Sequence, residues 1–159
     1  MPLEGYRVDD RLVHGQVVVG WGQPLDLAFL VVVDDALAES PWEQELYKMA
    51  APPELQVSFR TVSDAAAQHA GWASDARPGL LLTADVDTMA RLVRQVPAIR
   101  RVTLGGLHAA PGRKERLTYV FLDPADHDRL QSLASEGVEI VAQDVPGTRP
   151  APLAEWIGS

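Results

Sequence analysis

The sequence predicts an α/β fold: a single domain built on an open, doubly wound, mainly parallel sheet with helices on both faces. Short apolar runs of strand length alternate with segments of helical period, the pattern of β-α-β units. The runs at 29–33 and 80–82 are apolar at every position, so both faces of these strands should be covered. A length of 159 residues is typical of one domain, and we expect residues 1–159 to form it.

Seven segments have the length and the apolar content of strands. They are residues 6–8, 28–33, 55–59, 80–82, 99–104, 119–122 and 138–142.

Two sets of apolar residues recur at helical spacing, and each is expected to form a stripe that faces a core. The first set comprises Trp42, Leu46, Met49 and Ala50, and the second comprises Met89, Leu92, Val93 and Val96.

Several residues predict where helices begin and end. Asp123 followed by Pro124 is typical of an N-cap with proline in the first helical position, and Gly137 is typical of a stop. Ser63 before Asp64 predicts another cap. The prolines near the end of the chain predict an extended C-terminal arm over residues 146–159.

The composition excludes some classes of function. Fourteen Lys and Arg residues against 22 Asp and Glu residues give a net charge of −8, which argues against a nucleic-acid-binding protein. The chain has no cysteine and no apolar run long enough to span a bilayer, so the cytoplasm is the expected compartment. Without cysteine or a His-x-x-x-His spacing, no metal site is predicted.

In a doubly wound sheet, ligands bind beyond the carboxyl ends of the strands. This rule directs attention to residues 9–14, 34–35, 83–85 and 105–108.

The first of these segments contains the most side chains that could take part in catalysis. If His14 stands at the start of a helix, the backbone N–H groups of Gly15, Gln16 and Val17 can bind a phosphate beside its imidazole. Arg11 supplies a fork of donors for phosphoryl oxygens. These residue types suit a histidine nucleophile beside a bound phosphate.

A histidine nucleophile needs control of its tautomer, and two carboxylates are candidates for this role. Either Asp9 or Asp10 orients Arg11, or holds one ring nitrogen of His14 so that the other can attack. The alternative, without catalysis, is a turn with a capping aspartate, surface ion pairs and a partly buried histidine.

Residues 7–17 closely resemble the motif Arg-Ile-Asp-Asp-Arg-Leu-Ile-His-Gly-Gln-Val, which opens the IIB component of the mannose/fructose/sorbose family of the bacterial sugar phosphotransferase system. The resemblance extends in register over residues 3–147. It is carried further by Trp21, by the segments 31–35, 49–53 and 104–108, by Gly112-Arg113 and by residues 123–141. Departures from the family pattern lie in loops, at Ala84-Asp85, Leu107 and Ala109, and they leave the sugar and the partners undetermined.

The resemblance implies a phosphoryl relay. His14 would accept a phosphoryl group on its ring nitrogen nearer the backbone from a phosphohistidine of a IIA component. It would pass the group to a sugar held by the membrane components IIC and IID. Arg11 would stabilise the transferring charge, and no cofactor would be needed beyond the transient phosphohistidine. The protein would be cytoplasmic and peripherally associated with the inner-membrane transporter, and the resemblance also suggests a homodimer.

Four further residues have candidate roles. By resemblance Thr83 carries a hydroxyl near the phosphate, and the alternative is a helix N-cap or simple strand-end polarity. Gly105 and Gly106 are expected to let a loop approach the active edge, or to form an ordinary turn. Arg113 begins a basic run that meets either an acidic partner or only solvent.

Two other functions remain open at this point. A regulatory phosphocarrier would report phosphoryl flux without sugar transport, and a non-catalytic domain would bind a small anion without being phosphorylated.

Overall fold

The computed structural model describes residues 3–158, with the backbone alone at Gln16. The strands are β1 (Leu3–Asp9), β2 (Phe29–Val33), β3 (Gln56–Arg60), β4 (Gly79–Thr83), β5 (Arg101–Gly106), β6 (Lys114–Leu117), β7 (Val120–Leu122), β8 (Glu139–Ala142) and β9 (Ala151–Pro152). The α-helices are α1 (Pro41–Lys48), α2 (Val62–Ala73), α3 (Val86–Gln95) and α4 (Pro124–Ser135). A π-helix, η1 (Gln16–Trp21), and two 3₁₀ turns, η2 (Leu37–Glu39) and η3 (Leu153–Glu155), complete the described elements.

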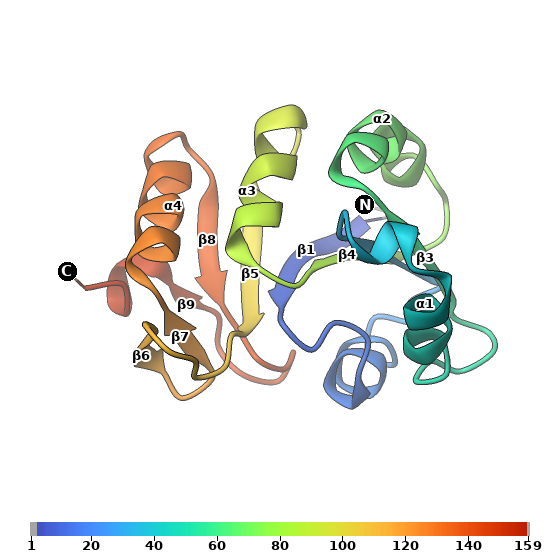
Figure 1. Ribbon diagram of the computed structural model, residues 1–159, viewed down its shortest axis with the longest axis horizontal. Coiled ribbons are helices and arrows are strands. Elements are labelled where there is room, and N and C mark those ends of the chain that lie inside the picture. Colours follow the sequence, from blue (N-terminus) through green and yellow to red (C-terminus); the bar gives the residue numbers. More distant parts are fainter. Residues whose placement is uncertain (1–2, 159) are drawn as a thin grey trace.

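Seven strands form the main sheet in the order β3-β2-β4-β1-β5-β8-β9 (Figure 1). All neighbours are parallel except β9, which pairs antiparallel with β8. The predicted α/β class with a mainly parallel sheet is therefore confirmed.

Each of the seven predicted strands has a counterpart, but one of them lies outside the main sheet. β7 pairs antiparallel with β6 in a separate two-stranded sheet. β6 has the sequence Lys-Glu-Arg-Leu, and such a polar run has no strand signature, so the hairpin was not predicted. β9 was also missed: it lies in the predicted C-terminal arm, where two residues pair with β8 before η3 begins.

The strands bury alternate residues in two apolar cores. In β2, Phe29 and Val31 belong to a core that also contains residues of α2, α3 and α4. Leu30 and Val32 belong to a second core on the opposite face, with Val17 of η1. This alternation explains why strands apolar at every position form the centre of the sheet.

Helices cover the two faces to different extents. The second core contains residues of β2, β3 and β4, but among residues 3–158 it contains none of β5 or β8. On that face β5 carries the polar residues Arg101 and Thr103, because Val102 and Leu104 point into the first core. The prediction of helices on both faces therefore holds for the half of the sheet that includes β2 and β4.

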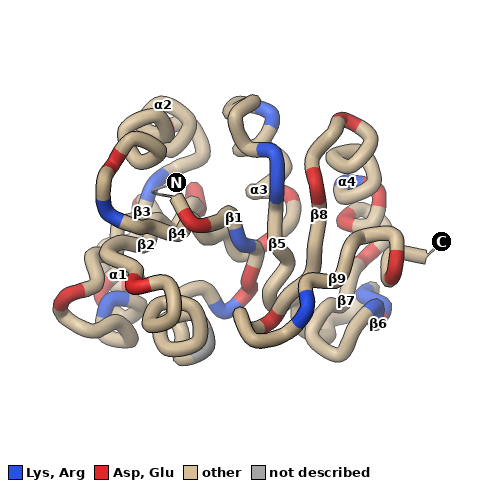
Figure 2. Tube along the Cα trace, turned by 180° about the vertical axis from the view of Figure 1, so that it is seen from behind, with Lys and Arg blue, Asp and Glu red and all other residues tan. Residues whose placement is uncertain are grey.

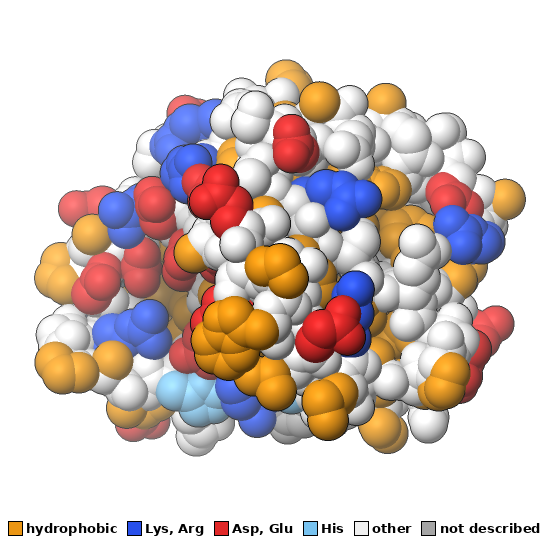
Figure 3. Space-filling view, turned by 45° about the vertical axis from the view of Figure 1, so that its right-hand side comes forward, with side chains coloured by type: hydrophobic (Ala, Val, Ile, Leu, Met, Phe, Trp, Pro, Cys, Tyr) orange, Lys and Arg blue, Asp and Glu red, His pale blue; other side chains and the backbone are white. Residues whose placement is uncertain are grey.

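The prediction that the apolar stripe of α1 faces a core was wrong. Trp42, Leu46 and Met49 are exposed by 67%, 56% and 80%. The opposite side of the helix is anchored: Gln44 Nε2 donates to the Leu37 carbonyl at 2.8 Å, and Tyr47 packs against the second core. Figure 3, which brings this side of the molecule forward, shows apolar side chains standing on the surface among charged ones.

The predicted stripe of α3 is confirmed, since Met89, Leu92 and Val93 are all buried. The predicted boundaries of α4 are also correct. Asp123 accepts a hydrogen bond from the Asp126 amide at 2.7 Å, and Gly137 has the left-handed φ of +94° that ends the helix.

The N-cap of α2 was predicted at Ser63, two residues after its observed position. The N-cap is Thr61, whose hydroxyl accepts from the Asp64 amide at 3.0 Å, while Ser63 lies inside the helix. Both residues are good caps, and only the backbone conformation distinguishes them. None of the helices described here is long and apolar enough to cross a membrane.

The exposure of the α1 stripe can be tested by paired truncations. We expect Leu82→Ala, at a fully buried position of β4, to lower the free energy of unfolding by about 2–5 kcal/mol because it leaves a cavity. Leu46→Ala should lower it by less than about 1 kcal/mol, because that side chain is mainly in solvent. Urea denaturation of both variants measures the difference, and equal losses would show that α1 buries its apolar stripe.

Candidate active site

The candidate site lies at the carboxyl ends of the central strands. β1 runs between β4 and β5, with Val8 in register with Thr83 on one side and Leu104 on the other. The chain leaves β1 at this edge and enters η1 after a short loop (Figure 1). In Figure 2, basic and acidic positions follow one another where β1 ends.

The loop after β1 turns sharply. The Leu12 amide donates to the Asp9 carbonyl at 3.0 Å, and Leu12 has a φ of +56°, which costs a non-glycine residue about 1–3 kcal/mol. Burial of Leu12 and Val13 in the second core offsets this strain. His14 follows with 15% of its side chain exposed.

The centre of the site is the Asp9 carboxylate, which is fully buried. Its Oδ2 lies 3.1 Å from Nε2 of His14 and 3.8 Å from the Arg7 guanidinium. Its Oδ1 accepts from the Arg11 amide at 3.1 Å and lies 3.8 Å from the Arg11 Nε. Of the two carboxylates considered from the sequence, Asp9 therefore contacts His14.

Opposing effects act on the pKa of Asp9. Burial alone would raise the pKa of this carboxyl, but His14, the Arg11 amide and Arg7 together hold the pKa below its ordinary value. Asp9 is thus ionised at neutral pH. Because a carboxylate only accepts hydrogen bonds, it favours the tautomer in which His14 carries its proton on Nε2. Nδ1, the nitrogen nearer the backbone, is then the nucleophilic one.

Arg7 is a component of the site for which the sequence suggested no role. Its side chain is 1% exposed, and its Nη1 and Nη2 donate to the carbonyls of Gln143 and Asp144 at 2.7 and 2.8 Å. The guanidinium also lies 4.5 Å from the centre of the Trp21 ring. Burial lowers the pKa of Arg7 to about 10, and Asp9 opposes this shift, so Arg7 remains charged. The signal available in the sequence was an arginine between the apolar residues Tyr6 and Val8 of the predicted strand.

The two glycines of β5 make room for these charges. A Cβ at Gly105 would lie 2.1 Å from the Arg7 guanidinium, and one at Gly106 would lie 3.3 Å from Asp9 Oδ1. The close approach predicted for this loop is thus an approach to Arg7 and Asp9.

Asp10 contacts His108, whereas the sequence analysis considered Arg11 and His14 as its partners. Its Oδ2 accepts from the His108 amide at 2.8 Å, and its Oδ1 lies 2.6 Å from His108 Nδ1. Arg113 joins this group: its Nη1 donates to the His108 carbonyl at 2.7 Å and lies 3.6 Å from Asp10 Oδ2. Asp10 therefore fixes the loop after β5, and Arg113 is part of that loop.

The predicted phosphate-binding residues are only partly brought together. Gly15 precedes η1, and the backbone of residues 16 and 17 forms its start, directly after His14; the side chain of Gln16 lies outside the described residues. With six residues, η1 has a weaker dipole than a longer α-helix. Thr83 is fully buried, and its hydroxyl donates to the Asp85 carbonyl at 3.0 Å, so its proton is not directed at His14. Nor does it cap α3, because Asp85 does.

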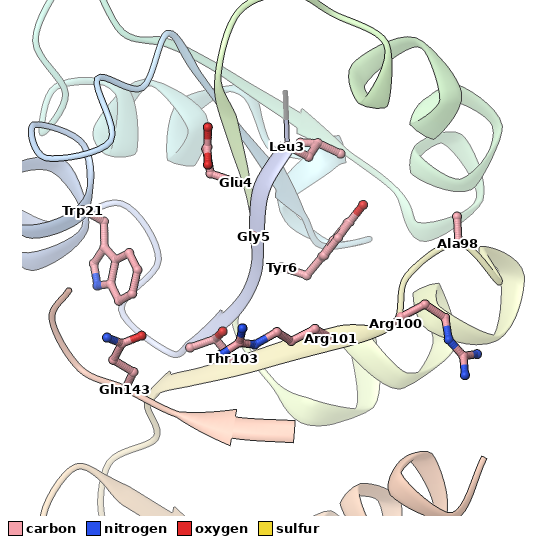
Figure 4. A pocket seen from close by; sticks show the side chains of 10 residues that line it. All are labelled: Leu3, Glu4, Gly5, Tyr6, Trp21, Ala98, Arg100, Arg101, Thr103 and Gln143. Atoms are coloured by element: carbon pink, nitrogen blue, oxygen red, sulfur yellow. The ribbon is translucent and has the colours of Figure 1, made fainter. Parts of the chain in front are cut away.

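A pocket of about 440 Å³ lies at the other end of β1 (Figure 4). Residues 3–6 of β1 line one side of it, and residues 100, 101 and 103 line the other, next to the point where β1 and β5 begin to pair at Arg7 and Thr103. Trp21 separates this pocket from the buried Arg7. In the described part of the chain, no three His, Asp or Glu side chains are grouped to hold a metal ion.

Comparison with known proteins gives one consistent result. Residues 4–159 match the family model described as the sorbose subfamily IIB component of the phosphotransferase system. The chain is 32% identical over 142 residues to the N-acetylgalactosamine-specific phosphotransferase enzyme IIB component 1 of Escherichia coli K12, covering 89% of each protein. It is 26% identical over 139 residues to the mannose-specific EIIAB component of the same organism, covering 87% of this chain and 43% of that protein.

A solved structure agrees with this result. The IIBSor domain of the sorbose permease from Klebsiella pneumoniae superimposes with a TM-score of 0.86 at 25% identity, over 98% of this chain and 95% of that domain.

The role of Arg7 in holding the site can be tested by removing its charge. We expect Arg7→Met to lower the free energy of unfolding by about 3–5 kcal/mol, because it leaves the buried Asp9 carboxylate and two partly buried carbonyls without this partner. The matched control is Arg101→Met on β5, where an exposed ion pair with Glu139 contributes about 1 kcal/mol or less. Urea denaturation measures both variants. Equal losses in the free energy of unfolding would contradict this account.

Proposed function

The chain belongs to the sorbose subfamily of IIB components of the phosphotransferase system, enzymes of phosphoryl transfer in sugar uptake, and on this basis we propose that His14 is the residue that carries the phosphoryl group. The observation that supports this assignment is the 3.1 Å contact between His14 Nε2 and the buried Asp9 carboxylate. That contact orients the ring and directs Nδ1 toward the reaction.

The proposed relay has two steps. In the first, Nδ1 of His14 attacks the phosphorus of a phosphohistidine on the donor; the donor N–P bond breaks and the Nδ1–P bond forms. In the second, a sugar hydroxyl oxygen attacks the phosphorus, the Nδ1–P bond breaks and the hydroxyl proton is released. Throughout, Asp9 stabilises the positive charge on the phosphorylated ring through Nε2–H.

Arg11 is the proposed stabiliser of the transferring group. Its side chain is 43% exposed, and its Nε lies 3.8 Å from the same carboxylate that contacts His14. Its fork of donors suits phosphoryl oxygens, and the N–H groups that begin η1 add partial positive charge. Most of the catalysis in such a transfer comes from positioning and charge stabilisation.

The proposed donor is a IIA component. Its support is that a relative of this chain is named EIIAB, so that the two functions are joined in one protein. We further propose that the acceptor is a sugar of the mannose/fructose/sorbose class held by the membrane components IIC and IID, with the chain acting at the cytoplasmic face of the membrane. A homodimer, which the family resemblance suggests, stays a prediction.

The assignment of His14 is tested by labelling with a phosphorylated IIA protein. We expect one acid-labile phosphoryl group per wild-type chain, mapped to His14 by mass spectrometry, and none on His14→Ala. His127→Ala is the matched control, because this histidine lies on α4 beside the Gly158 carbonyl. Uptake of one equivalent by His14→Ala would disprove the assignment.

The same experiment separates the two other functions. A wild-type chain that takes up no phosphoryl group would be an anion-binding domain. A labelled chain that never transfers the group to a sugar in the presence of membranes from the source organism would be a regulatory phosphocarrier.

The role of Arg11 is tested by the rate of labelling. We expect Arg11→Ala to slow phosphorylation of His14 by about 10²–10³-fold, as for the loss of one preorganised donor to the transition state. Arg91→Ala, which removes an arginine of similar exposure from an ion pair with Asp35, should leave the rate unchanged. An unchanged rate in Arg11→Ala, measured by rapid quench, would remove Arg11 from the mechanism.

A further inference from the structure

A second histidine stands on the rim of the site and is held by its own carboxylate. His108 follows the end of β5, and 52% of its side chain is exposed. Asp10 nevertheless contacts it twice, at the backbone amide (2.8 Å) and at Nδ1 (2.6 Å), while Arg113 contacts its carbonyl. Fixing an exposed side chain costs conformational entropy, which the Nδ1 contact offsets here, while the other two contacts fix the backbone of His108.

The contact with Asp10 determines which nitrogen of His108 is available. The carboxylate accepts a hydrogen bond from Nδ1–H, so Nε2 carries the lone pair in the neutral ring. A histidine oriented by a carboxylate, with the opposite nitrogen facing outward, has the arrangement of a general base. The roles of the two nitrogens are reversed at His14, where the carboxylate contacts Nε2.

His14 and His108 are held by consecutive residues, Asp9 and Asp10, where β1 ends. The His14 ring contacts Asp9, and Asp9 in turn lies against Gly106, where a Cβ would be 3.3 Å from Oδ1. His108 is held by Asp10, whose Cα is about 3.8 Å from that of Asp9 across one peptide bond. The two carboxylate–histidine pairs therefore lie at the same edge of the sheet, at the carboxyl ends of β1 and β5.

Only one of the two steps needs a base. Transfer between two histidines releases no proton, because a nitrogen lone pair attacks. Transfer to a sugar does release one, because the attacking atom belongs to a hydroxyl group.

Resting on the proposed function, we propose that His108 is the general base of the second step. The sugar oxygen forms its bond to phosphorus, the Nδ1–P bond of His14 breaks, and the hydroxyl proton passes to Nε2 of His108. Asp10 then stabilises the imidazolium that forms, and solvent takes the proton from this exposed ring.

The test separates the two steps in His108→Asn. The asparagine amide N–H can replace Nδ1–H at Asp10, so the loop stays fixed while the base is lost. His127→Asn is the matched control on α4. Each full-length protein is first labelled by phosphorylated IIA, then chased with a hexose and membrane vesicles from the source organism, and in parallel with buffer alone, where water is the hydroxyl acceptor.

We expect His108→Asn to be labelled at the wild-type rate, and to lose its phosphoryl group to sugar and to water about 10²-fold more slowly. His127→Asn should match the wild type in both steps. Equal rates of loss in His108→Asn and the wild type, or an equal slowing of labelling and loss, would overturn the role as a base. A wild-type chain that is not labelled at all would instead refute the proposed function, because that failure occurs before His108 is needed.

Discussion

A single buried carboxylate organises the candidate site. Asp9 lies within 4 Å of cationic or ionisable groups from three positions, Arg7, Arg11 and His14, and it has no exposure to solvent. A buried charge must be paired, so these groups cannot move independently of it. The geometry of the site therefore depends on Asp9 being ionised. The lowered pKa of Asp9 shows that its partners outweigh the effect of burial.

Two consecutive carboxylates have different roles because Asp9 is the last residue of β1 and Asp10 begins the turn that follows. Asp9 points into the molecule, and Asp10 points to the rim, where it holds His108 and Arg113. One turn of chain thus positions two histidines that are far apart in sequence. This division explains how an Asp-Asp pair can serve both the phosphoryl-carrying ring and the proton acceptor that we propose.

The sequence predicted those features that local pattern determines and missed those that depend on neighbours. Strands such as β2 were found because apolar residues at every position require cover on both faces. The apolar stripe of α1 was predicted to be buried and is exposed. The helical period identifies an apolar face but does not show whether another element covers it. Asp9 and Asp10 could not be distinguished by residue type. The partners of Arg7 are backbone carbonyls of Gln143 and Asp144, which leave no trace in a sequence pattern.

Arg7 links the site to the last third of the chain. Its guanidinium reaches over Gly105 to the segment that follows β8, so the position of Asp9 depends on residues more than 130 positions away. Trp21 adds a second attachment, since its indole N–H donates to the Asp144 carbonyl at 2.9 Å while its ring covers Arg7. The strand before the loop of residues 10–15 and the helix after it are thus fixed to the same segment. We infer that the loop keeps its strained turn at Leu12 because both of its ends are held there.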